Sequence, residues 1–472
     1  MALLPSECNQ YECGGNKVRN KWRSLMGLGM ASLFILAVAA CGGSKANDAK
    51  TGNEQPSPTA KPAVTETSAE PVLLRFWGGI PEDTGPADMI EKWNAENKDI
   101  QVEYVRFVND ASGNLKLDTA LISDTDAPDL YVSYSDTNLS RRIDAGMAEP
   151  LDDWIQQSGF DLEGMIGTAN ITKFSDKVYY LPGTKSMNVM FINKSMLDAI
   201  GEKVPTDWTW EEYEALALKL TKSGQYGAYL NPAWEPLPNE TMITAKPVDS
   251  WFAEDGSSNF DSEAARQGLE IQKRLYEGNA LVPYAEGVAN KIQPQDELLK
   301  GKAALVYSGT YLLRYIKDDE AYPNRDFQVA FAPLPQTAKG NNMNNGGFGD
   351  KISINSKSKN KEAAMKFLKW YIEEGNLDLI PGGRIPSSSK TDVVKVAELM
   401  IGDKEQYFDK ESFMNILQAS YTFKTNLDLT ALAEQRKILT EESEKYFMNV
   451  QSLDETVANL KKRADEAIAG AK

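Results

Sequence analysis

Residues 72–146 alternate between two hydrophobic periodicities, and this alternation constrains the fold more strongly than any other feature of the chain. Short apolar or alternating runs predict strands, and apolar residues at helical spacing follow each of them. The predicted strand–helix pairs are 72–79 with 85–97, 100–107 with 114–123, and 128–134 with 138–146. Repeats of this kind predict an α/β fold built on a parallel sheet. Ligands of such sheets bind at the carboxyl ends of the strands, so we expect a site near the turns 77–85 and 133–138.

Downstream the α/β pattern continues with different proportions. Residues 178–194 predict two extended segments around Pro182-Gly183. A helix is predicted over 206–224, with Thr206 or Asp207 as its N-cap and Gly224 at its C-terminus. Further helices are predicted at 262–279 and 360–376, a helix–strand–helix unit at 297–316, extended segments at 327–335 and 346–356, and mostly helix in the last ninety or so residues. A chain of 472 residues has room for roughly two or three domains.

The chain contains no histidine, and this excludes whole classes of catalytic and metal sites. A Ser-His-Asp triad, a Cys-His pair and a His-ligated zinc or iron site all need that residue. The formal net charge of −17 argues against nucleic acid as a partner, because such a partner requires a basic surface. No cofactor or metal is therefore expected, and any enzyme chemistry would depend on carboxylates, Lys, Tyr, Ser and Thr.

The N-terminal segment has the layout of a secretory signal. Basic residues of 17–23 precede an apolar run at 25–40, which is shorter than the roughly 18 residues of a spanning helix. The run ends at "VAAC", which resembles a bacterial lipobox with Cys41 as the lipidated N-terminus after cleavage; the alternative is an uncleaved membrane anchor. Residues 1–17 do not fit a signal, which suggests that translation starts at Val18.

Two consequences follow if the chain is cut before Cys41. Of the three cysteines, Cys8 and Cys13 are removed with the signal, so no internal disulfide and no cysteine nucleophile remain. Residues 42–71 contain no aromatic residue and Val64 as their only large apolar one, so they predict a disordered tether. The protein is then expected on the extracellular face of the bacterial cytoplasmic membrane, held there by its lipid.

Six segments in order give the body a family resemblance. They are "PDLYVSYSDTNLSRRIDAGMAEPLDDWI", "VYYLPGTKSMNVMFINKSMLDAIG", "PTDWTWEEYEALALKLT", "GKAALVYSGTYL", "VAFAPLP" and "ISINSKSKNKEAAMKFLKWYI". Together with the lipoprotein signal they resemble family 1 extracellular solute-binding proteins, the carbohydrate-binding components of ABC importers and relatives of maltose-binding protein. The resemblance extends over essentially all of 72–472.

The resemblance implies a two-lobed periplasmic-binding-protein-like fold of type II, with the ligand cleft between the lobes. Lobe 1 is expected at 72–182 plus 332–376, and lobe 2 at 183–331 plus 377–472. Pro182-Gly183 and Pro333–Pro335 would then lie at two crossings between the lobes. It also implies a monomer that captures a mono- or oligosaccharide and delivers it to the transmembrane subunits of an ABC permease.

A sugar site needs flat aromatic faces and hydrogen-bonding side chains. In lobe 1, Trp77 ends the first strand, and Tyr134 and Asp136 follow the third; relatives place a carboxylate at the position of Asp136. Trp77 has a core position as its alternative, and Asp136 could instead cap the following helix. The segment "NNGGFGDK" adds Phe348 and Asp350, for which a plain hairpin turn is an equal alternative.

In lobe 2, Trp234 and Glu235 lie in a proline-rich loop where relatives carry aromatic and acidic contacts to the ligand. Tyr311 follows Gly309 at a position where the family often has a stacking tryptophan. Arg384 follows two glycines near the third crossing, with a solvated surface position as its alternative. The other tryptophans that lie on or beside predicted helices are expected in the core: Trp93, Trp154, Trp208 and Trp370.

Two functions from other classes remain open at this stage. A secreted glycoside hydrolase would use a pair of carboxylates about 5–10 Å apart, and the chain has many carboxylates but no evident pair. A surface adhesin without a small ligand would use the tether equally well.

Overall fold

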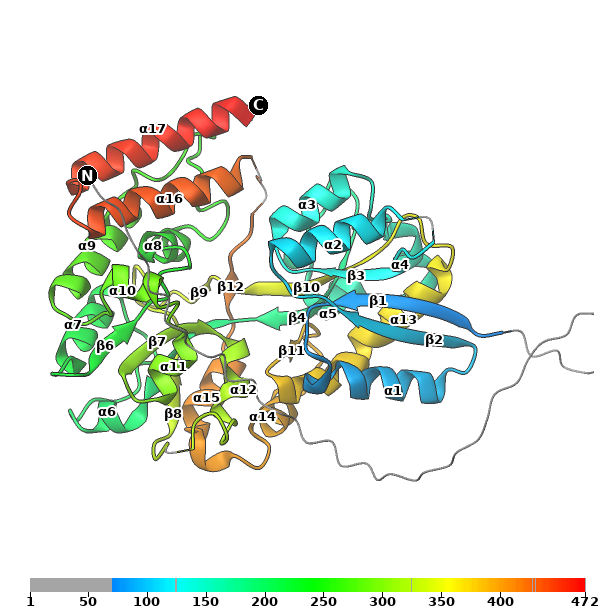
Figure 1. The fold of residues 1–472 in the computed structure, drawn as a ribbon, viewed down its shortest axis with the longest axis horizontal. Coiled ribbons are helices and arrows are strands. Elements are labelled where there is room, and N and C mark those ends of the chain that lie inside the picture. The colour runs from blue at the N-terminus through cyan, green and yellow to red at the C-terminus, as the bar shows by residue number, and fades with distance from the viewer. Residues whose placement is uncertain (1–69, 124, 324, 427, 429, 472) are drawn as a thin grey trace, which may run out of the picture. The chain divides into compact units, whose positions relative to one another are not determined.

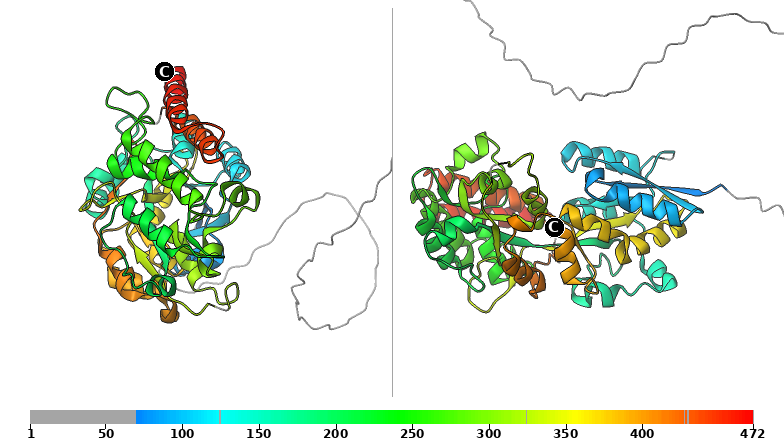
Figure 2. Two further views of the ribbon diagram at one scale, coloured as in Figure 1. Left: turned by 90° about the vertical axis from the view of Figure 1, so that its left-hand side faces the viewer. Right: turned by 90° about the horizontal axis from the view of Figure 1, so that it is seen from below.

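The computed structural model describes residues 70–471 except 124, 324, 427 and 429. The signal, Cys41 and the tether predicted from the sequence therefore lie outside the described residues. Two sheets organise the body. The first has six strands in the order β11-β4-β10-β3-β1-β2, and the second has four in the order β6-β7-β5-β8. In Figure 1 the first sheet lies to the right of the second, and Figure 2 shows the same separation from below.

The first sheet is mixed rather than purely parallel. Strand β1 pairs in parallel with β2 and β3, as the alternating pattern predicts, but β10 is antiparallel to β3 and β4. The strands are β1 Val72–Gly78, β2 Ile100–Arg106, β3 Leu130–Ser133, β4 Leu181–Ser186, β10 Gly347–Ile354 and β11 Ile385–Pro386. A parallel neighbour in the same sheet needs a crossover connection, usually a helix. Strand β10 enters the first sheet directly from the second sheet, so it can pair antiparallel.

Helices cover both faces of this sheet. The helices of the first lobe are α1 Pro86–Glu96, α2 Ala111–Leu121, α3 Asp136–Asp144, α4 Asp152–Ser158, α5 Leu162–Ile166 and α13 Lys361–Glu373. Phe76 packs edge-to-face on Phe367 of α13, 5.8 Å between ring centroids, and Trp93 of α1 packs on the same ring. On the opposite face Tyr131 packs with Leu117 of α2. The predicted core positions of Trp93 and Trp208 are confirmed, since each is at most 3% exposed.

The second lobe is built on β5 Asn188–Asn193, β6 Tyr226–Tyr229, β7 Ala303–Gly309 and β8 Val329–Ala332. Its helices are α6 Lys194–Asp198, α7 Trp210–Leu220, α8 Leu237–Ala245, α9 Glu263–Glu277, α10 Tyr284–Ala289, α11 Pro294–Leu299, α12 Leu313–Ile316, α14 Val393–Ile401, α15 Lys410–Gln418, α16 Leu432–Phe447 and α17 Leu453–Ala471. All seven residues of β7 are buried, as expected for a strand covered on both faces. The N-cap of α7 is Thr209, in a capping box with Glu212, and not Thr206 or Asp207.

The chain passes between the sheets three times. The first crossing lies at Met187, between β4 and β5, whereas Pro182 and Gly183 lie inside β4, where Pro182 pairs with Lys351 of β10. The second runs from β8 to β10 through the short strand β9 Met343–Asn344, which pairs with β12 Thr422–Phe423. The third follows β11, which still pairs with β4. In the part of the chain that the structure describes, no helix has the length and apolarity to cross a membrane.

Candidate site between the two lobes

The turn after β3 places Asp136 at the start of α3. Ser135 is the N-cap of this helix, because its side chain accepts a hydrogen bond from the backbone N–H of Asn138. The alternative that Asp136 itself caps the helix is therefore wrong, and its carboxylate is available for other contacts. The Nζ of Lys351 lies 3.0 Å from one of its oxygens, and the Nδ2 of Asn426 lies 3.4 Å from the other.

These contacts set the charge state of Asp136. Burial alone would raise the pKa of this carboxyl, but the ammonium groups of Lys351 and Lys424 and the hydrogen bond from Asn426 outweigh burial and lower the pKa. Lys351 responds in the opposite sense: burial lowers its pKa, and Asp136 more than compensates, so the pKa is raised. Asp136 and Lys351 thus form a charged pair at neutral pH.

Asp136 and Lys351 line a cavity of about 210 Å³, and residues of both lobes contribute to its walls. The first lobe contributes residues after β3, before β4, and on and just before β10, and the second contributes Phe423 of β12 and the segment after it. The lining residues are Asp136, Asn170, Thr172, Phe174, Tyr180, Asn345, Gly346, Gly347, Phe348, Lys351, Phe423, Lys424, Thr425 and Asn426. Hydroxyl, amide and charged groups dominate, and we call this the interlobe cavity.

Two aromatic rings meet in the interlobe cavity from different lobes. Phe348 of β10 and Phe423 of β12 pack edge-to-face, with ring centroids 6.0 Å apart and an interplanar angle of 73°. Phe348 is thus one of the two predicted ligand-binding residues, with Asp136, that the structure places in this cavity. Apolar rings beside polar side chains are the combination that saccharides require.

A second aromatic group lies in the second lobe at the ends of β6 and β7. The ring centroid of Trp234 is 6.1 Å from that of Tyr307 and 6.4 Å from that of Tyr311, both edge-to-face. The structure therefore brings together the predicted residues Trp234 and Tyr311. Glu235 forms an ion pair of 2.9 Å with Arg436 of α16, so its carboxylate already has a partner.

Asp350, Arg384 and Tyr134 form a separate group at the first sheet, in which Asp350 is buried and the other two are half-buried. Asp350 is 3% exposed and lies 3.6 Å from the guanidinium of Arg384. Asp350 holds the pKa of Arg384 above its usual value, while burial raises the pKa of Tyr134 well above 10. The Tyr134 hydroxyl accepts a hydrogen bond of 2.7 Å from the N–H of Gly79, and a Cβ on Gly79 would lie 2.9 Å from the Tyr134 ring. The glycine thus permits this close packing.

Trp77 lies apart from these groups. It is half-buried against Phe107, Leu117 and Tyr131, and the Nζ of Lys116 lies 5.6 Å from its ring centroid. Its side chain lies on the α2 face of the first sheet and does not line the interlobe cavity, so packing accounts for its position.

Sequence reasoning missed several cavity residues, notably Lys351, Lys424, Asn426 and Asn345. Lys351 had a signal, because it is a lysine inside an otherwise mostly apolar strand near two glycines. Lys424 and Asn426 had none: they follow a two-residue strand, and Asn426 contacts Asp136 across a separation of 290 residues.

Glu240 on α8 is a buried carboxyl next to this region. It is 4% exposed, and its Oε1 accepts hydrogen bonds from Asn239 at 2.9 Å and Asn345 at 2.6 Å. Its Oε2 is buried with no hydrogen-bond partner among the described residues. Burial raises the pKa of Glu240 to about 7, although Tyr307, Asn345 and Lys424 oppose the rise. The native protein therefore holds a proton here that the unfolded chain releases at a lower pH.

We expect Glu240→Gln to reduce the pH dependence of stability. A carboxyl whose pKa is raised in the native state stabilises the protein at low pH. This contribution to the free energy of unfolding, here about 3 kcal/mol, is lost as the pH rises from about 4.5 through about 7. Denaturant unfolding at pH 5 and pH 8 should show this loss in the native protein and not in the variant. The matched control is Glu82→Gln on the exposed turn before α1, which should leave the loss in place. An unchanged loss in Glu240→Gln would contradict the prediction.

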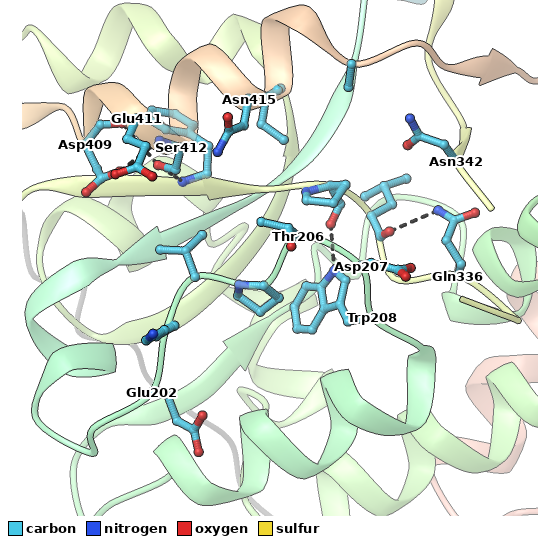
Figure 3. A pocket seen from close by; sticks show the side chains of 18 of the residues that line it. Glu202, Thr206, Asp207, Trp208, Gln336, Asn342, Asp409, Glu411, Ser412 and Asn415 are labelled. Atoms are coloured by element: carbon cyan, nitrogen blue, oxygen red, sulfur yellow. Dashed lines mark hydrogen bonds between the residues drawn. The ribbon is translucent and has the colours of Figure 1, made fainter. Parts of the chain in front are cut away.

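A larger pocket of about 620 Å³ lies on the second lobe, between the loop after α6, the loop after β8 and helix α15. Figure 3 shows Trp208 at its wall, with the indole hydrogen-bonded to the carbonyl of Pro333 at 2.9 Å. None of the predicted ligand-binding residues lines this pocket. Within the described residues, no group of three or more His, Cys, Asp or Glu side chains is arranged to hold a metal ion.

Comparison with known proteins decides the family. The model of the bacterial extracellular solute-binding protein family matches residues 79–377. The chain belongs to this family. Its predicted family and its two-lobed α/β fold are confirmed, and the family places it among extracellular proteins that bind solutes.

Solved structures share the fold of this solute-binding protein at low sequence identity. An ABC substrate-binding protein from Listeria monocytogenes in complex with cycloalternan is 19% identical, with a TM-score of 0.68 over 85% of this chain and 100% of that one. The sugar-binding protein MalE from Xanthomonas citri is 18% identical, with a TM-score of 0.68 over 84% and 98%. A curated relative, an uncharacterized lipoprotein from the oleD 5′ region of Streptomyces antibioticus, is 22% identical over 65% of this chain and 68% of its own length.

Proposed function

We propose that this solute-binding protein is the carbohydrate receptor of an ABC importer, which holds a mono- or oligosaccharide between its lobes and passes it to a membrane permease. The observation that carries the proposal is the interlobe cavity, where Asp136, Asn345 and Asn426 supply polar groups beside the rings of Phe348 and Phe423. Pyranose rings present hydroxyls at their edges and C–H groups on their faces, and this lining complements both.

The second aromatic group supports an extended site. Trp234 and Tyr311 lie at strand ends of the second lobe and remain half-buried, so their rings are partly accessible to a ligand. The solved relatives that share the fold include proteins described with cycloalternan, maltose and mannotriose. A binding role needs no covalent chemistry, which suits a chain without histidine.

A thermal-shift panel of neutral and acidic mono- and oligosaccharides, with product analysis, tests the proposal. A receptor gains about 2.7 kcal/mol of stability when the ligand concentration is 100 times Kd, and the sugar is recovered intact. Cleaved sugar would support a hydrolase instead, and no shift with any saccharide would overturn the proposal.

We further propose that Cys41 carries the lipid that anchors the protein outside the cytoplasmic membrane, as a monomer. Support comes from the sequence "VAAC" after a short apolar run and from the lipoprotein description of the curated relative. Cys41→Ala should abolish incorporation of labelled palmitate and shift the protein from the membrane fraction to the medium or an uncleaved precursor. Cys8→Ala, in the segment that is removed with the predicted signal, is the control and should leave labelling unchanged. Undiminished labelling of Cys41→Ala would contradict the assignment.

A further inference from the structure

The charges around the interlobe cavity are unusual for this protein. The chain as a whole carries 68 acidic and 51 basic residues. Among the described residues that line the cavity, however, Asp136 is the only acidic one, and Lys351 and Lys424 are both basic. The lining therefore carries a net positive charge inside a strongly acidic protein.

Lys351 and Lys424 differ in their partners. Lys351 is paired with Asp136 at 3.0 Å. The ammonium of Lys424 lies 5.2 Å from the ring centroid of Trp251 and forms no ion pair with any carboxylate that the structure describes. Trp251 is itself fixed, because its indole N–H donates to Asn239 at 2.9 Å. The half-buried ammonium of Lys424 thus lines the cavity with no described carboxylate in ion-pair contact, although Asp136 and Glu240 interact with it at longer range.

The carboxyls whose pKa Lys424 lowers, Asp136 and Glu240, are both engaged by other side chains. Asp136 is already engaged by Lys351 and Asn426. Glu235 is paired with Arg436, and Glu240 accepts its hydrogen bonds from Asn239 and Asn345. A half-buried charge without a partner is costly, and a ligand that brings an opposite charge recovers that cost on binding.

We propose that the saccharide bound in the interlobe cavity carries an anionic group, a uronic-acid carboxylate or a sulfate ester, that pairs with Lys424. This inference rests on the proposed carbohydrate-binding function and narrows its substrate class. A single anionic group per bound unit matches the single excess positive charge of the lining. Asp136, Asn345 and Asn426 are left to bind hydroxyls, and the rings of Phe348 and Phe423 to cover the sugar face.

Matched saccharide pairs test the proposal by calorimetry. The probes are oligogalacturonates, glucuronate-substituted xylo-oligosaccharides and oligomannuronates, each beside its methyl ester, and sulfated galacto-oligosaccharides beside their unsulfated forms. We expect the acidic member of at least one pair to bind more tightly than its neutral form by about 10- to 100-fold. The advantage should shrink as the salt concentration rises. If a carboxylate pair shows this preference, the anionic group of the ligand is a uronic-acid carboxylate; if the sulfated pair shows it, the group is a sulfate ester.

The variant Lys424→Met should remove the preference for the acidic member, and Lys424→Arg should retain most of it. Lys395→Met, an exposed lysine on α14, is the control and should change nothing. If neutral saccharides bind as tightly as acidic ones, or if Lys424→Met lowers only the stability of the free protein, this inference is overturned and the carbohydrate receptor stands. If no saccharide binds at all, both are overturned.

Discussion

Replacing Asp118 with alanine is expected to destabilise the protein by about 3–5 kcal/mol, because it leaves a buried guanidinium without its counter-charge. Arg142 is 0% exposed, and its Nε lies 2.7 Å from the Asp118 carboxylate. The other guanidinium nitrogens donate to Ser133 and Asn114, each at 2.8 Å. These two neutral acceptors cannot balance the positive charge of Arg142. Without Asp118, the cost of burying that charge away from water is no longer compensated.

The effect can be measured by denaturant unfolding beside two further variants. Asp126→Ala removes an exposed ion pair with Arg75 at 3.2 Å and should cost less than about 1 kcal/mol. Adding Arg142→Met to Asp118→Ala should recover much of the lost stability, since the buried charge is then gone. A loss below 1 kcal/mol for Asp118→Ala, or a double variant less stable than the single one, would contradict this reasoning.

The architecture of the first lobe could be predicted because local patterns determined it. The three strand–helix pairs of 72–146 occur where the periodicity predicts them. The first crossing was misplaced because Pro182 and Gly183 look like a turn but serve as a strand. A Cβ on Gly183 would lie 2.9 Å from the ring of Tyr371, so this glycine permits close packing of α13 on β4. Such a tertiary requirement leaves no local signal.

At the N-cap of α7, in contrast to Gly183, the sequence did contain a local signal, but the prediction overlooked it. Thr209 and Glu212 have the three-residue spacing of a capping box, and both of its hydrogen bonds form in the structure. The earlier residues Thr206 and Asp207 are equally good capping types, and residue type alone does not separate the three. The partner at the third helical position decides between them.

Two of the predicted residues lie in the interlobe cavity. Asp136 could be predicted because it follows a strand of the parallel part of the first sheet, and Phe348 because it lies in a glycine-rich segment. The partners of Asp136, which are Lys351 and Asn426, come from an antiparallel strand and from the segment after β12, which meet it through the crossings between lobes. Asp350 and Arg384 were predicted for the same cleft, but they form an ion pair of 3.6 Å with each other and do not line the interlobe cavity. Whether they or the aromatic group of Trp234 contact a ligand stays a prediction.

Replacing Asp136 with alanine is expected to weaken binding of the saccharide selected by the panel about 10- to 150-fold. A hydrogen bond from a sugar hydroxyl to a charged carboxylate contributes about 1.5–3 kcal/mol, and the lowered pKa of Asp136 keeps this carboxylate ionised at neutral pH. Calorimetry at pH 7 measures the loss. Asp144→Ala, on the exposed end of the same helix, is the control and should bind normally.

The double variant Asp136→Ala with Lys351→Met separates ligand contact from charge balance. If Asp136 acts only by neutralising Lys351, removal of both charges should restore affinity, because no buried ammonium then remains unpaired. If Asp136 binds the sugar directly, as we expect, the double variant should bind as weakly as Asp136→Ala while regaining stability in the absence of ligand. Restored affinity in the double variant would assign Asp136 to the framework of the cavity and leave Asn345 and Asn426 as its hydroxyl-binding groups.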